Sequence, residues 1–219
     1  MIIGEGNLSF SFALGAYLML DDPWEVIKTT IYEKSVMEGF ISKGRETTKK
    51  KCKLNYRLLN GGKDPNPSDL AEKHERIDEL PSLQIHTGVD AINLYATLPP
   101  EVLPFLTEFE YCLWFQCPWV EYLHAGGETT FDLISKFLSS AYEVQTPGNY
   151  VIVGIMNIFP YVQEYRLQEL FTHPQYKFVG YDDSLINEVI KYGYKYQSRM
   201  RLNRAELSHV TLVFEKRGQ

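Results

Sequence analysis

Two spacings of hydrophobic residues alternate along this chain of 219 residues, one typical of strands and one typical of helices. Runs rich in β-branched or continuously apolar residues predict strands at 1–3, 26–33, 83–90, 111–115, 150–156, 176–183 and 209–216. Helical spacing predicts helices at 9–20, 35–59, 68–79, 131–142 and 162–171, and another that ends near 191. Strands that alternate with helices predict an α/β fold, in which helices cover both faces of a mostly parallel sheet.

The pattern runs through residues 1–219 without an internal repeat, a low-complexity tract or a break in composition, which predicts a single domain. The clearest flexible loop is GGKDPNPSD, which begins at Gly61. The first strand, Met1–Ile3, is shorter than a central strand of about five or six residues. We therefore expect either an abbreviated first strand or a native start upstream of Met1.

A glycine turn, GEGN at Gly4–Asn7, joins the first strand to the first helix. In parallel sheets, ligands bind at the carboxyl ends of the strands where the strand order reverses, so this turn is the default binding site. Ser9 stands where GxGxxG has its third glycine, which argues against a dinucleotide, and no GK[ST] follows to form a Walker A loop. On the turn alone, a structural role and a binding role are equally open.

Two carboxylates follow successive strands after this turn. Glu33 ends the second predicted strand, and Asp90 ends the third. A carboxylate in this place accepts hydrogen bonds from ribose hydroxyls and repels a 2′-phosphate. Asp90 alone can instead cap the next helix, but together with the turn the two acids favour adenosine without a phosphate tail. S-adenosylmethionine is such a ligand, because a sulfonium and an amino acid end take the place of pyrophosphate.

Composition argues against several other kinds of site. The net charge of −6 and the pI near 5.4 argue mildly against extensive binding along phosphates. Three cysteines without CxxC spacing and five scattered histidines predict neither a disulfide framework nor a metal site. No apolar run reaches the roughly 18 residues of a membrane span, and no secretory signal is evident. We therefore expect an intracellular protein without a membrane partner, cytoplasmic or, in a eukaryote, nucleolar.

With these motifs, the sequence resembles the Rossmann-like methyltransferases related to large-subunit ribosomal RNA uridine-N(3) methyltransferases. GEGNLSFS at Gly4–Ser11 is similar to that family's distinctive GEGDFSFS, and HTGVDAI at His86–Ile92 is similar to its HGVDAT. TTIYEKS at Thr29–Ser35 matches the family's TSYDS loosely, GYKYQSRM at Gly193–Met200 resembles GYEHKRT, and HVTLVFEK resembles the closing strand. The resemblance covers nearly the whole chain. It implies a Rossmann-like methyltransferase fold with about seven strands, the C-terminal one antiparallel.

The resemblance also implies S-adenosylmethionine as cofactor, S-adenosylhomocysteine as product and RNA as substrate. The residues expected to bind the cofactor are Gly4, Glu5, Gly6, Asn7, Leu8, Ser9, Glu33, Lys34, Asp90, Ala91 and Phe115. One motif departs from the family, because its FNFPHTG reads FQCPWVE at Phe115–Glu121. In the family this motif faces the methyl group and the target base. The catalytic candidates are therefore Gln116, Pro118 and Trp119.

The residues that differ from the family motif determine which catalytic steps this site can perform. The amide of Gln116 can donate a hydrogen bond to a uracil carbonyl and stabilise the anion that forms there. Trp119 can stack on a base or serve as a core or lid residue, but it cannot act as an acid or a base. Cys117 has no evident basic neighbour, so we interpret it as a buried structural thiol. Three functions stay open: an RNA uridine methyltransferase, a methyltransferase with a small-molecule or protein acceptor, and a non-catalytic cofactor- or partner-binding homologue.

Structured RNA is bound through base stacking and local basic surfaces. The candidate surfaces here are KKKCK at Lys49–Lys53 and RMRLNR at Arg199–Arg204. A solvated helix face or loop is the simpler interpretation of each.

Overall fold

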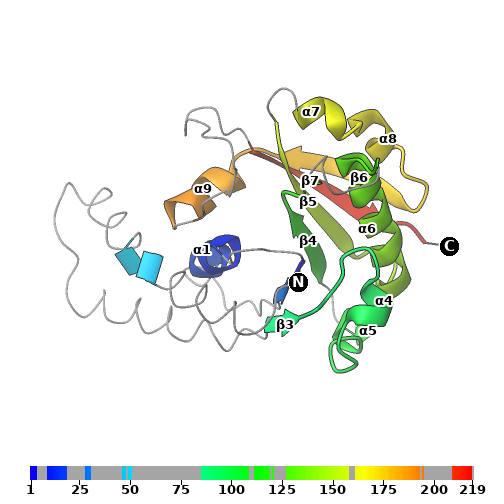
Figure 1. Ribbon diagram of the computed structural model, residues 1–219, viewed down its shortest axis with the longest axis horizontal. Helices are drawn as coiled ribbons and strands as arrows, with labels where there is room; N and C mark the ends of the chain where they lie inside the picture. The colour runs from blue at the N-terminus through cyan, green and yellow to red at the C-terminus, as the bar shows by residue number, and fades with distance from the viewer. Residues whose placement is uncertain are drawn as a thin grey trace.

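Within the described part of the chain, seven strands form one mixed sheet in a computed structural model (Figure 1). The structure describes residues 1–3, 9–18, 28–30, 46–47, 49–50, 85–108, 111–118, 120, 127–157, 161–192, 194 and 209–218. The strands are β1 (Ile2–Ile3), β2 (Lys28–Thr30), β3 (Ile85–Thr87), β4 (Cys112–Gln116), β5 (Tyr150–Met156), β6 (Tyr176–Asp182) and β7 (His209–Lys216). Their order across the sheet is β3-β2-β1-β4-β5-β7-β6.

Helices cover both faces of this sheet, as the sequence predicts. They are α1 (Ser9–Leu18), α4 (Leu94–Thr97), α5 (Phe105–Glu108), α6 (Thr130–Val144), α7 (Tyr161–Glu164), α8 (Leu167–Phe171) and α9 (Leu185–Lys191). Helices α1 and α9 lie on one face, and α4 to α8 lie on the other (Figure 1).

The strand directions define where the chain reverses its course. Strands β1 to β5 are paired in parallel, whereas β7 is antiparallel to both β5 and β6. The antiparallel C-terminal strand is therefore confirmed. The chain runs outward from β1 through β2 to β3 and then returns to β4 on the other side of β1. This reversal places the topological switch point between the carboxyl ends of β1 and β4.

Helix α1 packs onto the sheet through one continuous apolar face. Phe10, Ala13 and Leu14 are buried at helical spacing and lie in one cluster with Trp114 of β4 and Ile186 of α9. Burial of this kind stabilises a helix whose N-terminus lies next to the predicted glycine turn.

Helix α6 packs onto the opposite face. Ile134, Phe137 and Leu138 are fully buried, and the Phe137 ring lies edge-on to Phe115 of β4 with 4.8 Å between ring centroids. These are the residues whose spacing predicts this helix, and Phe131 of the same apolar face is partly buried.

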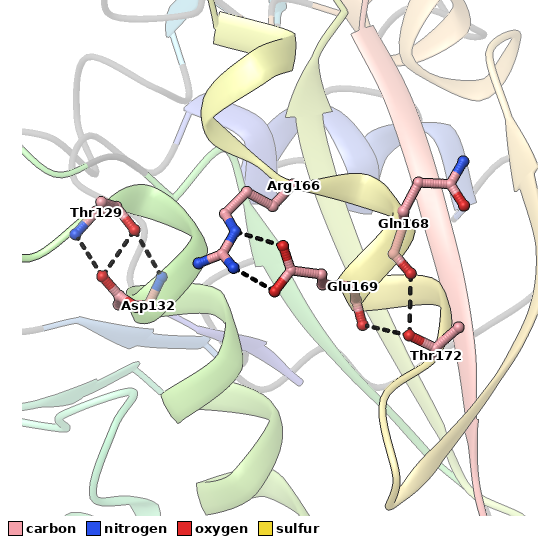
Figure 2. Close-up of polar contacts among 6 residues, drawn as sticks. All are labelled: Thr129, Asp132, Arg166, Gln168, Glu169 and Thr172. Carbon is pink, nitrogen blue, oxygen red and sulfur yellow. Dashed lines mark hydrogen bonds and ion pairs between the residues drawn. The ribbon is translucent and has the colours of Figure 1, made fainter.

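A capping box begins α6 (Figure 2). The Thr129 hydroxyl accepts the Asp132 N–H at 3.2 Å, and the Asp132 carboxylate accepts the Thr129 N–H at 2.8 Å. The Thr129 hydroxyl also donates to this carboxylate and is the main cause of the lowered pKa of Asp132. The guanidinium of Arg166 lies between this helix start and Glu169, with which it pairs (Figure 2). It also stacks over the Phe131 ring. Arg166 therefore links α6 to α8.

The predicted helix at 162–171 is wrong in one respect, because it is broken into α7 and α8. Arg166 adopts a left-handed φ of 46°, which interrupts the helical backbone. Tyr165 before it turns inward, is 1% exposed, and accepts the Met156 N–H with its hydroxyl at 3.2 Å. The break therefore allows Tyr165 to satisfy the buried end of β5.

Other boundaries also differ from the prediction. Strand β1 is as short as the sequence predicts, and β3 ends at Thr87 rather than at Asp90. Helices α4 and α5 were not predicted, because each has only four residues and too little sequence for a recognisable period. Residues 46–47 and 49–50 of the predicted helix at 35–59 are helical; the rest of it, and the predicted helix at 68–79, lie outside the described residues.

Candidate functional site

The switch point brings two predicted motifs to one edge of the sheet. Ile3 at the end of β1 is opposite Phe115 of β4, and Gln116 is the last residue of β4. The glycine turn follows Ile3 in sequence, and α1 begins at Ser9 as predicted. Both strands therefore end where α/β sheets bind ligands.

Several predicted site residues lie outside the described residues, and their roles stay predictions. These are Gly4, Glu5, Gly6, Asn7, Leu8, Glu33, Lys34 and Trp119. The Arg199–Arg204 patch also lies outside, as do residues 51–53 of the other basic patch.

Asp90 shapes the loop after β3. Its Oδ1 accepts the Ile92 N–H at 3.0 Å, and its carbonyl accepts the Asn93 N–H at 3.0 Å. This is an Asx turn. The alternative that Asp90 caps the next helix is wrong, because the N-cap residue of α4 is Asn93. Since the turn uses Oδ1, the second carboxylate oxygen can accept a hydrogen bond from a ligand.

The loop is fastened to α6 by a buried hydrogen bond. The Leu94 N–H, at the start of α4, donates to the Ser140 hydroxyl at 2.7 Å. Leu94 is fully buried and Ser140 is 5% exposed, so the bond satisfies a backbone N–H that lies inside the protein. Ala91, between Asp90 and this contact, lies in the core cluster. A helix on the sheet thus fixes the position of the predicted cofactor loop.

Replacing Ser140 by alanine is therefore expected to lower the free energy of unfolding by about 1–3 kcal/mol, because the buried Leu94 N–H loses its acceptor. Ser139→Ala is the matched control. Its hydroxyl is exposed and donates to the Ser135 carbonyl of its own helix, so we expect a change within about 0.5 kcal/mol. Urea denaturation of the two variants measures both values. Equal losses would show that the bond to Leu94 is not what holds the loop.

Gln116 lies inside the protein and its amide is bound on both sides. Its Oε1 accepts the indole N–H of Trp114 at 2.9 Å. Its Nε2 donates to the Tyr194 hydroxyl at 3.2 Å and to the Cys117 sulfur at 3.3 Å. The side chain is 8% exposed. To donate to a substrate carbonyl, this amide would have to give up one of these partners.

Gly154 of β5 makes room for this arrangement. It is the register partner of Gln116 on the neighbouring strand β4, and a Cβ at this position would lie 2.1 Å from Gln116 Oε1. The glycine thus allows the amide to lie across the neighbouring strand.

Cys117 turns the chain out of β4. Its φ of 50° is left-handed, and its N–H donates to the Gly154 carbonyl at 2.9 Å. Burial raises the pKa of the thiol to about 12, against smaller opposing effects of hydrogen bonds with Tyr194 and Gln116. The thiol is therefore protonated at neutral pH, which agrees with a structural role rather than a nucleophilic one.

Phe115 and Pro118 lie on either side of these residues and are both buried. Phe115 is 6% exposed and packs against Phe137 in the α6 core. Its described contacts are those of a core residue, and the cofactor role predicted for it is not tested by them.

Two further residues lie at this edge that the sequence patterns do not mark as site residues. Tyr194 is 7% exposed, and its ring lies edge-on to Phe10 and to His209. His209 begins β7 opposite Met156 and is 5% exposed. Burial lowers the pKa of His209 to about 4, so its imidazole is neutral at pH 7. The signal available was that both residues lie in the last two motifs of the family resemblance.

No helix in the described part of the chain is long and apolar enough to cross a membrane. Over the same residues, no group of three or more His, Cys, Asp or Glu side chains is placed to hold a metal ion.

The strand order, the switch point and the antiparallel β7 define a Rossmann-like methyltransferase fold. The crystal structure of the 16S rRNA methyltransferase KamB has this fold: it matches with a TM-score of 0.50 and 14% identity over 99% of this chain and 87% of KamB. No family model matches the sequence, and no curated protein matches it significantly.

Two further structures are similar at lower TM-scores. A 16S rRNA (adenine(1408)-N(1))-methyltransferase from Catenulisporales acidiphilia gives a TM-score of 0.48 at 10% identity, over 100% of this chain and 86% of that one. TrmN from Thermus thermophilus gives 0.45 at 15% identity, over 98% of this chain. The present chain spans 43% of the length of TrmN.

Proposed function

We propose that this protein is an S-adenosylmethionine-dependent methyltransferase that acts on RNA, with a uridine ring nitrogen of ribosomal RNA as the acceptor. The observation that carries the proposal is the switch point, where β1, the strand before the GEGNLSFS motif, lies beside the end of β4 with Gln116 and Pro118. The fold shared with a 16S rRNA methyltransferase supports it. The choice of uridine rests on the motif resemblance.

The chemistry of the described loop fits this cofactor. The Asp90 carboxylate can accept a hydrogen bond from an adenosyl group while its Oδ1 keeps the turn with Ile92. Ala91 is small and lies in the core next to Asp90, so it adds no bulk at that point. The glycine turn and Glu33 are the residues predicted to hold the remainder.

When bound, S-adenosylmethionine supplies an activated methyl group, so the protein mainly has to orient the acceptor and exclude water. Phe10, Trp114 and Tyr194 form an apolar wall beside the end of β4. A uracil imide must lose its proton. Cys117, with a pKa of about 12, and His209, with a pKa of about 4, are both unsuited to take it at neutral pH. We propose that the proton passes to solvent.

Transfer of labelled methyl from S-adenosylmethionine into RNA, protein and small-molecule fractions tests the proposal. We expect label in the RNA, and 3-methyluridine as the labelled nucleoside after digestion. Label in another nucleoside would overturn the uridine assignment alone. Label only in protein or metabolites would point to another acceptor. Binding of the cofactor without any transfer would show a non-catalytic homologue.

Asp90→Asn separates the two roles of this side chain. Asparagine can form the same turn with the Ile92 N–H, so we expect the free energy of unfolding to change by less than about 0.5 kcal/mol. Loss of the charge should weaken S-adenosylhomocysteine binding about tenfold, because charge-assisted hydrogen bonds are the stronger ones. Calorimetric titration and urea denaturation measure the two effects. Unchanged affinity would remove Asp90 from the site.

A further inference from the structure

We propose that Tyr194 is a positioning residue, which holds the turn at Gln116–Pro118 in the conformation that receives the methyl acceptor. This inference rests on the proposed function, because it assigns a role within the same site. It concerns a residue that lies 78 positions beyond Gln116 in the chain.

Tyr194 is itself held firmly. It follows α9 and is 7% exposed. Its ring lies edge-on to Phe10 of α1, with 5.2 Å between centroids, and to His209 of β7, with 5.7 Å. Contacts from two elements therefore fix the direction of its hydroxyl.

That single hydroxyl contacts two consecutive residues of the turn. It accepts from Gln116 Nε2 at 3.2 Å and donates toward the Cys117 sulfur at 3.7 Å. A phenolic hydroxyl can donate and accept at once, so both contacts are compatible.

The turn needs such support because its backbone is strained. Cys117 has a φ of 50°, a left-handed value that costs free energy for a residue with a side chain. It also precedes Pro118, and a residue before proline favours extended backbone. A conformation of this kind persists only where its surroundings hold it, and Tyr194, Gln116 and the Gly154 carbonyl are what hold it here.

The same cluster reaches toward the cofactor side of the site. Phe10 lies in the first turn of α1, and its ring packs on Trp114 with 4.9 Å between centroids as well as on Tyr194. Tyr194→Phe keeps this ring packing and removes only the hydroxyl. We therefore expect the cofactor side to stay intact while the turn loses its support.

The experiment compares wild type with Tyr194→Phe and with the matched control Tyr150→Phe, well below the midpoint of thermal unfolding. Tyr150 begins β5 at the opposite end of the sheet and is 43% exposed. For Tyr194→Phe we expect kcat for methyl transfer to RNA to fall at least about tenfold with KM for S-adenosylmethionine within about twofold, because small misplacements are costly in catalysis. Alkylation of Cys117 by iodoacetamide, mapped by mass spectrometry, should speed up about tenfold, because release of the turn exposes the sulfur and this outweighs the small rise in the thiol pKa that loss of the Tyr194 hydrogen bond causes. Tyr150→Phe should change neither.

Unchanged kcat in Tyr194→Phe would overturn the inference, and so would an equal rise in KM, which indicates general loosening of the fold. If the wild type transfers no methyl to RNA, the proposed function fails, and the alkylation rate alone decides whether Tyr194 holds the turn. Gln116→Met breaks the same hydrogen bond from the other side. It replaces Tyr194→Phe in the alkylation assay if that variant does not fold, and an unchanged rate there would again overturn the inference.

Discussion

Replacing Gly154 by alanine is expected to lower the free energy of unfolding by about 2–4 kcal/mol, because it disrupts a buried hydrogen-bond network. The new Cβ would lie 2.1 Å from Gln116 Oε1 and 2.7 Å from its Cδ, so the whole amide must move. Gln116 is 8% exposed, and its displaced amide cannot exchange its partners for water where it stands. The indole N–H of Trp114 then loses its acceptor inside the protein.

A double-mutant cycle checks this explanation by urea denaturation. In a Gln116→Ala background the obstructing amide is gone, so Gly154→Ala should cost less than about 0.5 kcal/mol. Gly180→Ala is the matched control in another strand, because a Cβ there meets nothing within 4 Å. A cost that stays the same with and without the Gln116 side chain would contradict the steric account.

The second large effect is expected in the pH dependence of stability. His209 has an ordinary pKa of 6.5 in the unfolded chain and a pKa lowered by burial to about 4 in the folded one. Between pH 6.5 and pH 4 the His209 imidazole is protonated in the unfolded state but neutral in the folded state. The free energy of unfolding therefore decreases as pH falls from 6.5 toward 4. The loss amounts to about 1.4 kcal/mol per pH unit, or roughly 3 kcal/mol in all.

His209→Phe keeps a ring beside Tyr194 and cannot titrate. Over this pH window, the slope of the unfolding free energy against pH should therefore decrease by the amount that corresponds to about one proton. His173→Gln is the comparison variant. Burial lowers the pKa of His173 as well, but this residue is more exposed, so we expect a smaller change. Unfolding free energies measured from pH 7 down to pH 4 test this, and an unaltered slope in His209→Phe would assign the proton to another group.

Much of the fold could be predicted from the sequence, because local patterns determine it. The strand at 209–216 is predicted with its observed bounds, since its apolar run packs into the sheet along its whole length. The helix over 131–142 is likewise confirmed, because the spacing of Ile134, Phe137 and Leu138 matches one buried face. The break at Arg166 was not predictable, since it depends on Tyr165 reaching the end of β5.

In the candidate site, too, local features could be predicted and long-range contacts could not. The end of the first strand, the start of the first helix at Ser9 and the loop at Asp90 could be located by sequence alone, because strand ends, helix starts and turn chemistry are local features. The surroundings of Gln116 could not, since its partners Tyr194 and Gly154 come from distant parts of the chain. The motif pointed to a side chain facing the substrate, whereas the fold buries its amide in an internal network.

We propose that the carboxyl edge between β1 and β4 binds S-adenosylmethionine. Calorimetric titration of the wild-type protein with S-adenosylhomocysteine tests it most directly, with Asp90→Asn titrated beside it. We expect saturable binding at one site per chain in the wild type and about tenfold weaker binding in Asp90→Asn. Two results would contradict this proposal. One is a folded wild-type protein that does not bind S-adenosylhomocysteine, and the other is an affinity that is unchanged in Asp90→Asn, Glu33→Ala and Gly6→Val.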